Sequence, residues 1–154
     1  MEISEKLFKA EVYEQCLNAI QSRIANAELA LQQAREASQD DTKSSAGDKY
    51  ETTREMMQQD IDRNNAQLYE AKKSSFQLEQ CKDVEINGQV KAGALVKTSK
   101  VLLYLAVSIG QLNLYDQTVF AVSPASPIGQ TLIGKCCGDT FTFNGVSQSI
   151  EGIY

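Results

Sequence analysis

The sequence predicts an α+β protein in two parts. An N-terminal antiparallel helical hairpin is expected over residues 1–81, and a small antiparallel β-sheet domain with one short helix over residues 82–154. Apolar residues repeat with a helical period up to Gln80 and alternate as in strands after it. Neither proline precedes position 124. The first part carries ten basic and fifteen acidic side chains, whereas the second carries five of each.

The helical part contains two seams in which apolar or small residues are spaced alternately by four and three positions. The first seam consists of Tyr13, Leu17, Ile20, Ile24, Ala27, Leu31 and Ala34. The second consists of Met57, Ile61, Asn64, Leu68, Ala71, Ser75 and Leu78. Such heptad spacing is typical of helices that pack as a coiled coil. Two helices of about 35 residues would each span roughly 50 Å.

The stretch Ser38–Tyr50 is the polar, Gly- and Ser-containing break between the two seams. It predicts that the chain folds back there as an antiparallel hairpin. Small seam residues such as Ala27 and Ala71 would let the helices approach closely, and Asn64 would fix their register. An intermolecular coiled coil fits the same pattern, but a short connector between seams of equal length favours pairing within one chain.

The connector region carries a cluster of acidic side chains. They are Glu36, Asp40, Asp41, Asp48 and Glu51. Clustered carboxylates hold divalent cations through hard oxygen ligands, and Mg²⁺ often takes only one or two of them from a protein. Structural interpretations compete with this one: Ser45 and Asp48 fit a helix-capping pattern, and Asp40 and Asp41 fit solvated turn residues.

The second part reads as a set of short strands. Asn-Gly pairs between alternating apolar flanks predict β-hairpins over residues 84–90 and 139–150. In the second hairpin we expect Phe141 and Phe143 to face inward. The continuously apolar run at 101–107 predicts a central strand covered on both faces, and "TVFAV" predicts a further strand.

A short helix is expected after these strands. Pro127 suits its first position, Ser126 can cap it, and Gly134 can close it. We expect Leu132 and Ile133 to turn onto the sheet. The residues around the cap, Ala125 to Ile128, should form an exposed corner.

Composition excludes several kinds of site. The chain has no histidine, and its four cysteines include no CxxC pair, which excludes ordinary zinc sites and His-dependent catalytic triads. The cysteines are Cys16, Cys81, Cys136 and Cys137. We interpret the adjacent pair as small, partly buried residues in a reducing compartment rather than as reactive thiols.

Charge and hydropathy also bear on partners and location. A net charge of −5 without a basic block is repelled by phosphate backbones, so a protein partner is favoured over direct nucleic-acid binding. The longest apolar run, at 101–107, is too short to span a bilayer, and residues 1–15 lack the plan of a signal peptide. We therefore expect a cytoplasmic protein that does not associate with membranes.

The stretch "SPIGQTLIGKCCGDTFTF", residues 126–143, resembles the C-terminal domain of the Gre family of bacterial transcript-cleavage factors. The family carries Ser-Pro-Ile/Leu-Ala/Gly-x-Ala-Leu-Ile/Leu-Gly-Lys, and then Gly-Asp before an alternating strand. The matching residues are Ser126, Pro127, Ile128, Gly129, Leu132, Ile133, Gly134, Lys135, Gly138 and Asp139. "YETTRE", residues 50–55, is similar to the family's Tyr-x-x-Ala-Arg-Glu opening of the second helix. The resemblance covers nearly the whole chain.

The resemblance implies an FKBP-like C-terminal domain that docks at the secondary channel of bacterial RNA polymerase through Ser126–Ile128. It also implies that the coiled coil enters the channel and that its acidic tip helps hold a second Mg²⁺ there, so that backtracked RNA is hydrolysed. Asp40 and Asp41 are the first candidates for the metal, and Asp48 is the next. The protein would then be a monomeric transcription elongation factor that stimulates the polymerase and is not itself an enzyme. It would contact nucleic acid only through the polymerase.

The tip departs from the family pattern. The family's Asp and Glu, seven and four positions before its tyrosine, correspond here to Lys43 and Ala46. Asp41 replaces that Asp only if the connector is two residues longer. A regulator that occupies the channel without stimulating cleavage is therefore the alternative. A prolyl isomerase, suggested by fold analogy alone, is a third hypothesis, but few aromatic side chains remain in the second part to line its pocket.

Overall fold

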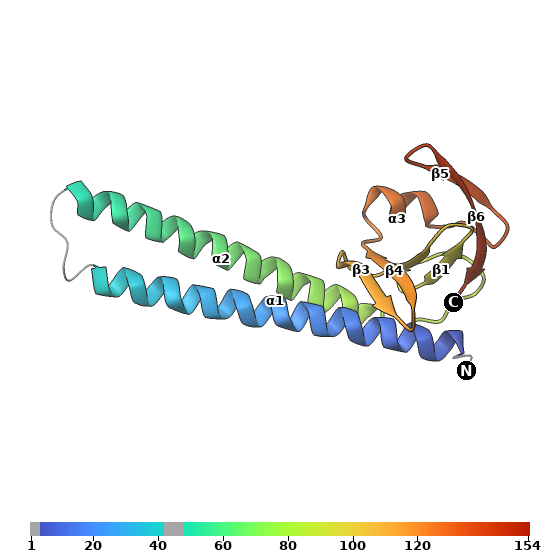
Figure 1. Ribbon diagram of the computed structural model, residues 1–154, viewed down its shortest axis with the longest axis horizontal. Helices are drawn as coiled ribbons and strands as arrows, with labels where there is room; N and C mark the ends of the chain where they lie inside the picture. Colours follow the sequence, from blue (N-terminus) through green and yellow to red (C-terminus); the bar gives the residue numbers. More distant parts are fainter. Residues whose placement is uncertain (1–3, 42–47) are drawn as a thin grey trace. The chain divides into compact units, whose positions relative to one another are not determined.

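The computed structural model describes residues 4–41 and 48–154, with side chains for all of these except 40, 41 and 48–50. Two long helices, α1 (Glu5–Asp41) and α2 (Asp48–Gln80), precede a six-stranded sheet and the short helix α3 (Pro127–Leu132) (Figure 1). The strands are β1 (Leu95–Thr98), β2 (Leu102–Leu105), β3 (Gly110–Leu114), β4 (Gln117–Val122), β5 (Thr140–Phe143) and β6 (Val146–Ile153). The predicted α+β class, with packed helices before a mostly antiparallel sheet, is confirmed.

The chain divides into two compact units. One comprises Ile20–Lys73, which is the greater part of both long helices. The other comprises Met1–Ala19 together with Ser74–Tyr154, so the first turns of α1 and the last turns of α2 belong with the sheet. The end of α2 at Gln80 lies beside the boundary expected from the sequence, but the sheet-containing unit also takes in both helix bases.

Within Ile20–Lys73 the two helices pack along the predicted seams. The buried seam residues are Ile20, Ala27, Leu31 and Ala71. The half-buried seam residues are Ile24, Ala34, Met57, Ile61, Asn64 and Leu68. Residues spaced by three and four lie on one face of a helix, and here that face is turned away from solvent. The seam prediction is confirmed.

In the sheet-containing unit, α1 carries a further buried stripe. Phe8, Val12 and Cys16 follow one another at four-residue spacing, and all three are buried. The Phe8 ring centroid lies 6.5 Å from that of Tyr115, in the turn between β3 and β4. The base of α1 therefore packs against this turn. The seam prediction missed the stripe because it began at Tyr13.

The sheet has the strand order β3-β4-β2-β1-β6-β5. β2 lies between β1 and β4 and is largely buried, as predicted for a central strand over 101–107, and β4 confirms the strand predicted from "TVFAV". One pairing departs from a fully antiparallel sheet, because β2 and β4 run parallel with Leu102 opposite Val119. The position of β3 explains this pairing. β3 lies on the outer side of β4 and pairs with it in an antiparallel hairpin, so the chain runs along β4 in the same direction as along β2.

β5 and β6 form the hairpin predicted over 139–150. Asn144 and Gly145 have φ values of 52° and 78°, the left-handed conformation that a two-residue type I′ turn requires. Phe141 is buried and Phe143 half-buried, while the two threonines of β5 are exposed. The alternation predicted for this strand is confirmed.

The hairpin predicted over 84–90 is wrong. Residues 84–87 belong to no strand of the described chain, and Gln89 forms only an isolated bridge with Cys136. The hairpin that does occur before β4 turns at Tyr115 and Asp116, whose φ values are 49° and 62°. Neither residue gives the Asn-Gly signal of such a turn, so the sequence did not indicate it.

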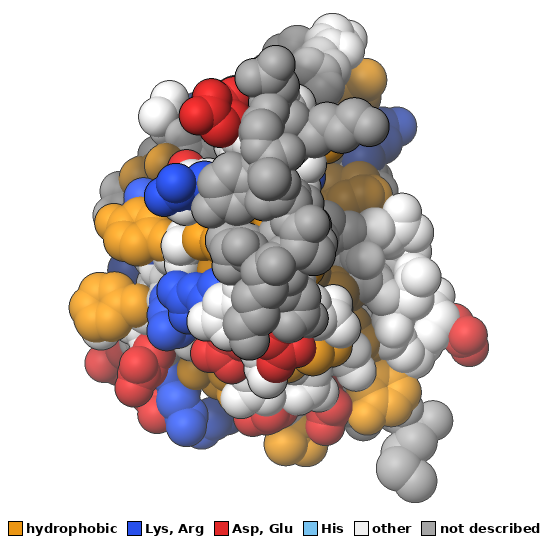
Figure 2. All heavy atoms as spheres, turned by 90° about the vertical axis from the view of Figure 1, so that its left-hand side faces the viewer, with side chains coloured by type: hydrophobic (Ala, Val, Ile, Leu, Met, Phe, Trp, Pro, Cys, Tyr) orange, Lys and Arg blue, Asp and Glu red, His pale blue; other side chains and the backbone are white. Residues whose placement is uncertain are grey.

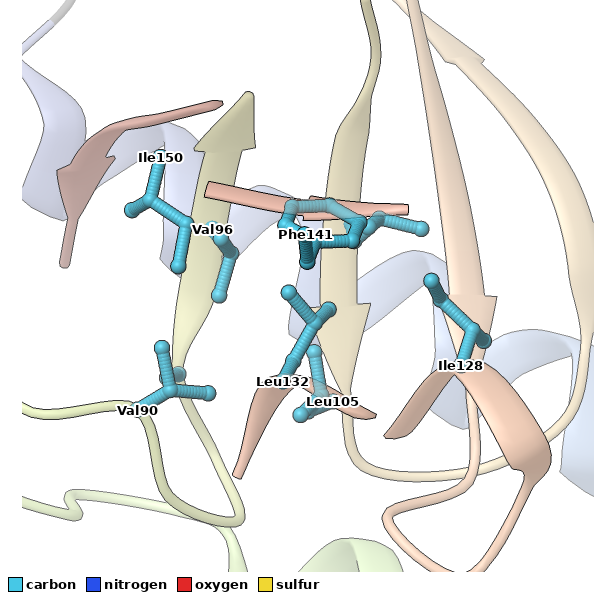
Figure 3. Packing of buried hydrophobic residues seen from close by; sticks show 9 residues of the cluster. Val90, Val96, Leu105, Ile128, Leu132, Phe141 and Ile150 are labelled. Atoms are coloured by element: carbon cyan, nitrogen blue, oxygen red, sulfur yellow. The ribbon is translucent and has the colours of Figure 1, made fainter. Parts of the chain in front are cut away.

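The core of the sheet is one cluster of apolar side chains (Figure 3). Its buried members are Val90, Ala94, Val96, Leu103, Leu105, Ile128, Leu132, Phe141 and Ile150. α3 contributes Ile128 and Leu132 to this cluster, which also includes Leu105 and Phe141 (Figure 3). Burying a side chain of this size contributes about 1.5–3 kcal/mol, so the inner face of α3 anchors the helix to the sheet.

Candidate functional site

The predicted metal ligands lie at the two helix ends that the connector joins. Asp40 and Asp41 are the last two residues of α1, and Asp48 is the first residue of α2. Only residues 42–47 separate these ends along the chain. The side chains of the three aspartates and the predicted cap at Ser45 lie outside the described residues. Among the side chains that are described, no three of His, Cys, Asp or Glu gather in a group that could hold a metal ion.

The helix ends give these carboxylates opposite electrostatic roles. A helix carries partial positive charge at its N-terminus and partial negative charge at its C-terminus. Asp48 therefore stabilises the start of α2, whereas Asp40 and Asp41 destabilise the end of α1 by about 0.3–1 kcal/mol each. No basic residue in the last turn of α1 offsets them. The charge of Asp48 thus suits the start of its helix, whereas the charges of Asp40 and Asp41 oppose the dipole at the end of theirs.

The second candidate site is the corner at the start of α3, where Ser126 acts as the predicted N-cap. Its Oγ accepts a hydrogen bond from the Gly129 amide at 3.2 Å and donates one to the Ser123 carbonyl at 2.5 Å. Pro127 occupies the first helical turn, where a missing amide proton leaves no hydrogen bond unmade. The corner is therefore held by its own backbone and cap.

Ile128 is not the exposed contact residue that we expected. It is 9% exposed and belongs to the core, whereas Ile133, which we expected on the sheet, is 43% exposed. Ile128 and Leu132 are four residues apart and share the inner face of this short helix, so the next residue turns outward. The exposed residues around α3 include Ala125, Pro127, Gln130 and Ile133.

Gly129 is required by a close approach of backbone. A Cβ at this position would lie 2.7 Å from the Pro124 carbonyl oxygen and closer still to that of Ser123. The loop before α3 is thus drawn against the first turn of the helix, and the Ser126 amide also donates to Ser123. The glycine of the Ser-Pro-Ile-Gly stretch therefore has a steric explanation.

The Gly-Lys and Gly-Asp parts of the motif also have structural explanations. Gly134, with a φ of 87°, ends α3, donates its amide to the Val90 carbonyl and accepts from the Gln89 side chain at 2.9 Å. The Asp139 carboxylate accepts a hydrogen bond from the Cys136 amide at 2.8 Å and closes the turn before β5. These residues build the corner and are not placed as a reactive group.

The four cysteines lie in two environments. Cys16 and Cys81 are buried, and burial raises the pKa of the Cys16 thiol to about 12 and the pKa of the Cys81 thiol above its usual value. Thiols held in the protonated form are poor nucleophiles. Cys136 and Cys137 are exposed, which corrects our expectation that they are partly buried. The Cys137 thiol donates to the Glu151 carbonyl at 3.2 Å.

The charged side chains are mixed in sign on the face shown in Figure 2. Outside the grey atoms, Asp and Glu are interspersed with Lys and Arg, and no broad basic area is seen on that face (Figure 2). Phosphate backbones bind through clustered basic side chains. The described part of this face shows no such cluster of basic side chains (Figure 2).

No family model matches the chain, and no curated protein matches it either. Within residues 4–41 and 48–154, no helix combines the length and the apolarity needed to cross a membrane. A functional assignment therefore rests on the residues themselves and on the resemblance seen in the sequence.

Proposed function

We propose that the protein is a Gre-like elongation factor, a monomer that binds bacterial RNA polymerase at its secondary channel and stimulates the polymerase's own cleavage of backtracked RNA. One observation carries the proposal. Asp40, Asp41 and Asp48 stand at adjoining helix ends, and the first two occupy positions where the helix disfavours negative charge. Carboxylates kept at an unfavourable position point to a use outside the helix. The resemblance of residues 50–55 and 126–143 to the Gre family supports the same assignment.

The role that we propose for Asp40 and Asp41 is to add oxygen ligands to a second Mg²⁺ of the polymerase. Mg²⁺ keeps several of its waters and needs only one or two protein carboxylates. When bound, such an ion acts as a Lewis acid and lowers the pKa of an attacking water. The two aspartates would hold the ion in place, and the protein itself would then need no active site. Mg²⁺ would be shared with the polymerase and not carried by the free protein.

We place the polymerase contact on the outer face of α3, because Ile128 belongs to the core. Ser126 and Pro127 fix the start of this helix, and Ile133 offers an exposed apolar side chain at its end. A contact held rigid before binding loses little conformational entropy on binding, so even a small face of this kind is effective. Ala125 and Gln130 border it.

Backtracked transcription complexes incubated with the protein and Mg²⁺ test the proposal. We expect the parent protein to shorten transcripts and Asp40→Asn/Asp41→Asn to slow this stimulated cleavage about tenfold or more, which corresponds to about 1.4 kcal/mol. Polymerase affinity should stay unchanged. Asp60→Asn/Asp62→Asn, at two exposed carboxylates within α2, is the matched control and should cleave like the parent.

A second candidate function is a channel-binding regulator that does not stimulate cleavage. The observation that favours it is the presence of Lys43 and Ala46 where the Gre family has its Asp and Glu. A parent protein that binds the polymerase, never shortens a transcript at any Mg²⁺ concentration and competes with an active cleavage factor would establish this function. Asp48→Asn should leave transcript cleavage unchanged under either function, because its position is explained by the helix start.

A further inference from the structure

The segment that follows α2, residues 84–87, forms no strand pairing with any residue that the structure describes. From Val84 to Asn87 the chain runs without a turn or bend, with Val84 and Ile86 half-buried and Glu85 and Asn87 exposed. Its backbone amides and carbonyls make no hydrogen bond to any described residue. A straight segment with side chains that alternate and backbone groups that are free is able to accept an added strand.

Side-chain contacts hold this segment in place while its backbone stays free. Val84 lies against Gly93, which has a φ of 92°, and a Cβ on Gly93 would approach the Val84 Cβ to 3.1 Å. Ile86 packs against the buried core of the sheet. Because the segment is anchored before any partner arrives, pairing with it would require little further ordering.

A groove of about 540 Å³ opens beside the segment. The first turns of α1 line it with Lys6 and Lys9, residues 83–86 line it as well, and Ile153 and Tyr154 complete it. Its volume lies within the range of sites that take small ligands, and its apolar side chains suit the side chains of a short peptide.

Lys9 forms no ion pair with the carboxylates that line the same groove. It is half-buried, and it forms no ion pair with any residue that the structure describes. Burial, together with the nearby charge of Lys91, lowers the pKa of Lys9 below its usual value. A carboxylate brought in by a ligand would stabilise the charged amine. The acidic residues that also line the groove are Glu5, Asp83 and Glu85, so a uniformly acidic ligand would be repelled.

We propose that residues 84–87 accept an extended peptide segment of a partner protein as an added strand. One acidic side chain of that peptide pairs with Lys9, and basic side chains lie beside Asp83 and Glu85. This charge pattern favours a peptide of mixed charge over a second copy of the chain, because edge-to-edge pairing of two copies would bring Glu85 near its own counterpart. The inference does not depend on the proposed function.

The probe is an N-acetylated, C-amidated octapeptide that alternates valine with polar residues, with one central glutamate between two lysines. We expect it to slow amide hydrogen exchange at residues 84–87 about tenfold or more at saturation. Lys9→Gln should weaken its binding, followed by fluorescence anisotropy, about tenfold, the loss expected for a charge-assisted hydrogen bond. The matched control is Lys97→Gln, at an exposed lysine of β1, which should bind like the parent.

A second peptide separates backbone pairing from side-chain contacts. Methylation of alternate backbone nitrogens removes the hydrogen bonds of an added strand and keeps every side chain, and we expect it to abolish binding. Undiminished binding of the methylated peptide would overturn the proposal, and so would the absence of binding and of slowed exchange at millimolar unmethylated peptide. Protection of residues 84–87 that rises with protein concentration alone would assign the site to a second copy and equally overturn it.

Discussion

Gly129→Ala measures how tightly the loop before α3 packs against the helix. The added Cβ would lie 2.7 Å from the Pro124 carbonyl oxygen and still closer to that of Ser123, so these backbone atoms must move. Overpacking usually costs about 1–3 kcal/mol, and contact with backbone in place of a flexible side chain puts this case near the upper value. Alanine recovers about 0.5–1 kcal/mol because glycine is less favourable within a helix. We therefore expect a net loss of about 2 kcal/mol in the free energy of unfolding.

Thermal unfolding followed by circular dichroism tests this magnitude. For a chain of this length, a loss of about 2 kcal/mol lowers Tm by about 4–8 °C. Gln130→Ala changes the next residue of α3, which is exposed, and should leave Tm almost unchanged. The Gly129 amide, which donates to Ser126 in the parent, should also exchange faster in Gly129→Ala. Equal Tm values for the two variants would refute the reasoning, because the loop would then yield without cost.

Three further predictions follow from the same geometry. Asp40→Asn/Asp41→Asn removes two negative charges from the C-terminus of α1, so we expect the free energy of unfolding, measured by urea denaturation, to rise by about 1 kcal/mol. A lower free energy of unfolding would contradict the destabilising effect that we assign to these charges. Ile133→Asp should weaken polymerase binding about tenfold and leave the melting temperature unchanged. Ile128→Asp should unfold the sheet-containing unit, because it buries a charge. The opposite pattern would indicate that Ile128, and not Ile133, contacts the polymerase. Stability should fall as pH rises from about 9 towards about 12, since the folded Cys16 thiol keeps a proton that the unfolded one loses. Urea denaturation at several pH values should show that the free energy of unfolding falls less steeply with pH in Cys16→Ala than in the parent. Equal slopes in the two proteins would mean that other groups cause the fall.

The features that could be predicted from the sequence are those fixed by neighbours along the chain. The heptad seams follow from spacing within one helix, and the β5–β6 turn follows from Asn144 and Gly145, which readily adopt left-handed conformations. The start of α3 follows from Ser126 and Pro127, whose cap and fixed φ act within one turn. Each of these signals lies within one helix or one turn.

The predictions that failed depended on contacts with distant parts of the chain. Asn87 and Gly88 carry the same dipeptide signal as the true hairpin, but no two described strands flank them as β5 and β6 flank Asn144 and Gly145. Ile128 and Ile133 exchanged their expected environments because a helix of six residues is oriented by what the sheet offers it, not by its own pattern. The buried stripe that includes Phe8 likewise depends on Tyr115, more than a hundred residues away.

Some residues of this chain are explained by the fold, whereas others carry charges that oppose the helix in which they lie. Ser126, Gly129 and Asp139 match the Gre pattern, and each is explained by a cap, a close approach or a turn, so their presence indicates how the corner is built. The negative charges of Asp40 and Asp41 oppose the charge distribution at the end of α1. A sequence that satisfied the fold alone would place neutral or basic residues there. The motif residues are therefore explained by the architecture of the sheet-containing unit, and the proposed activity depends on Asp40 and Asp41, whose charges oppose the dipole at the end of α1.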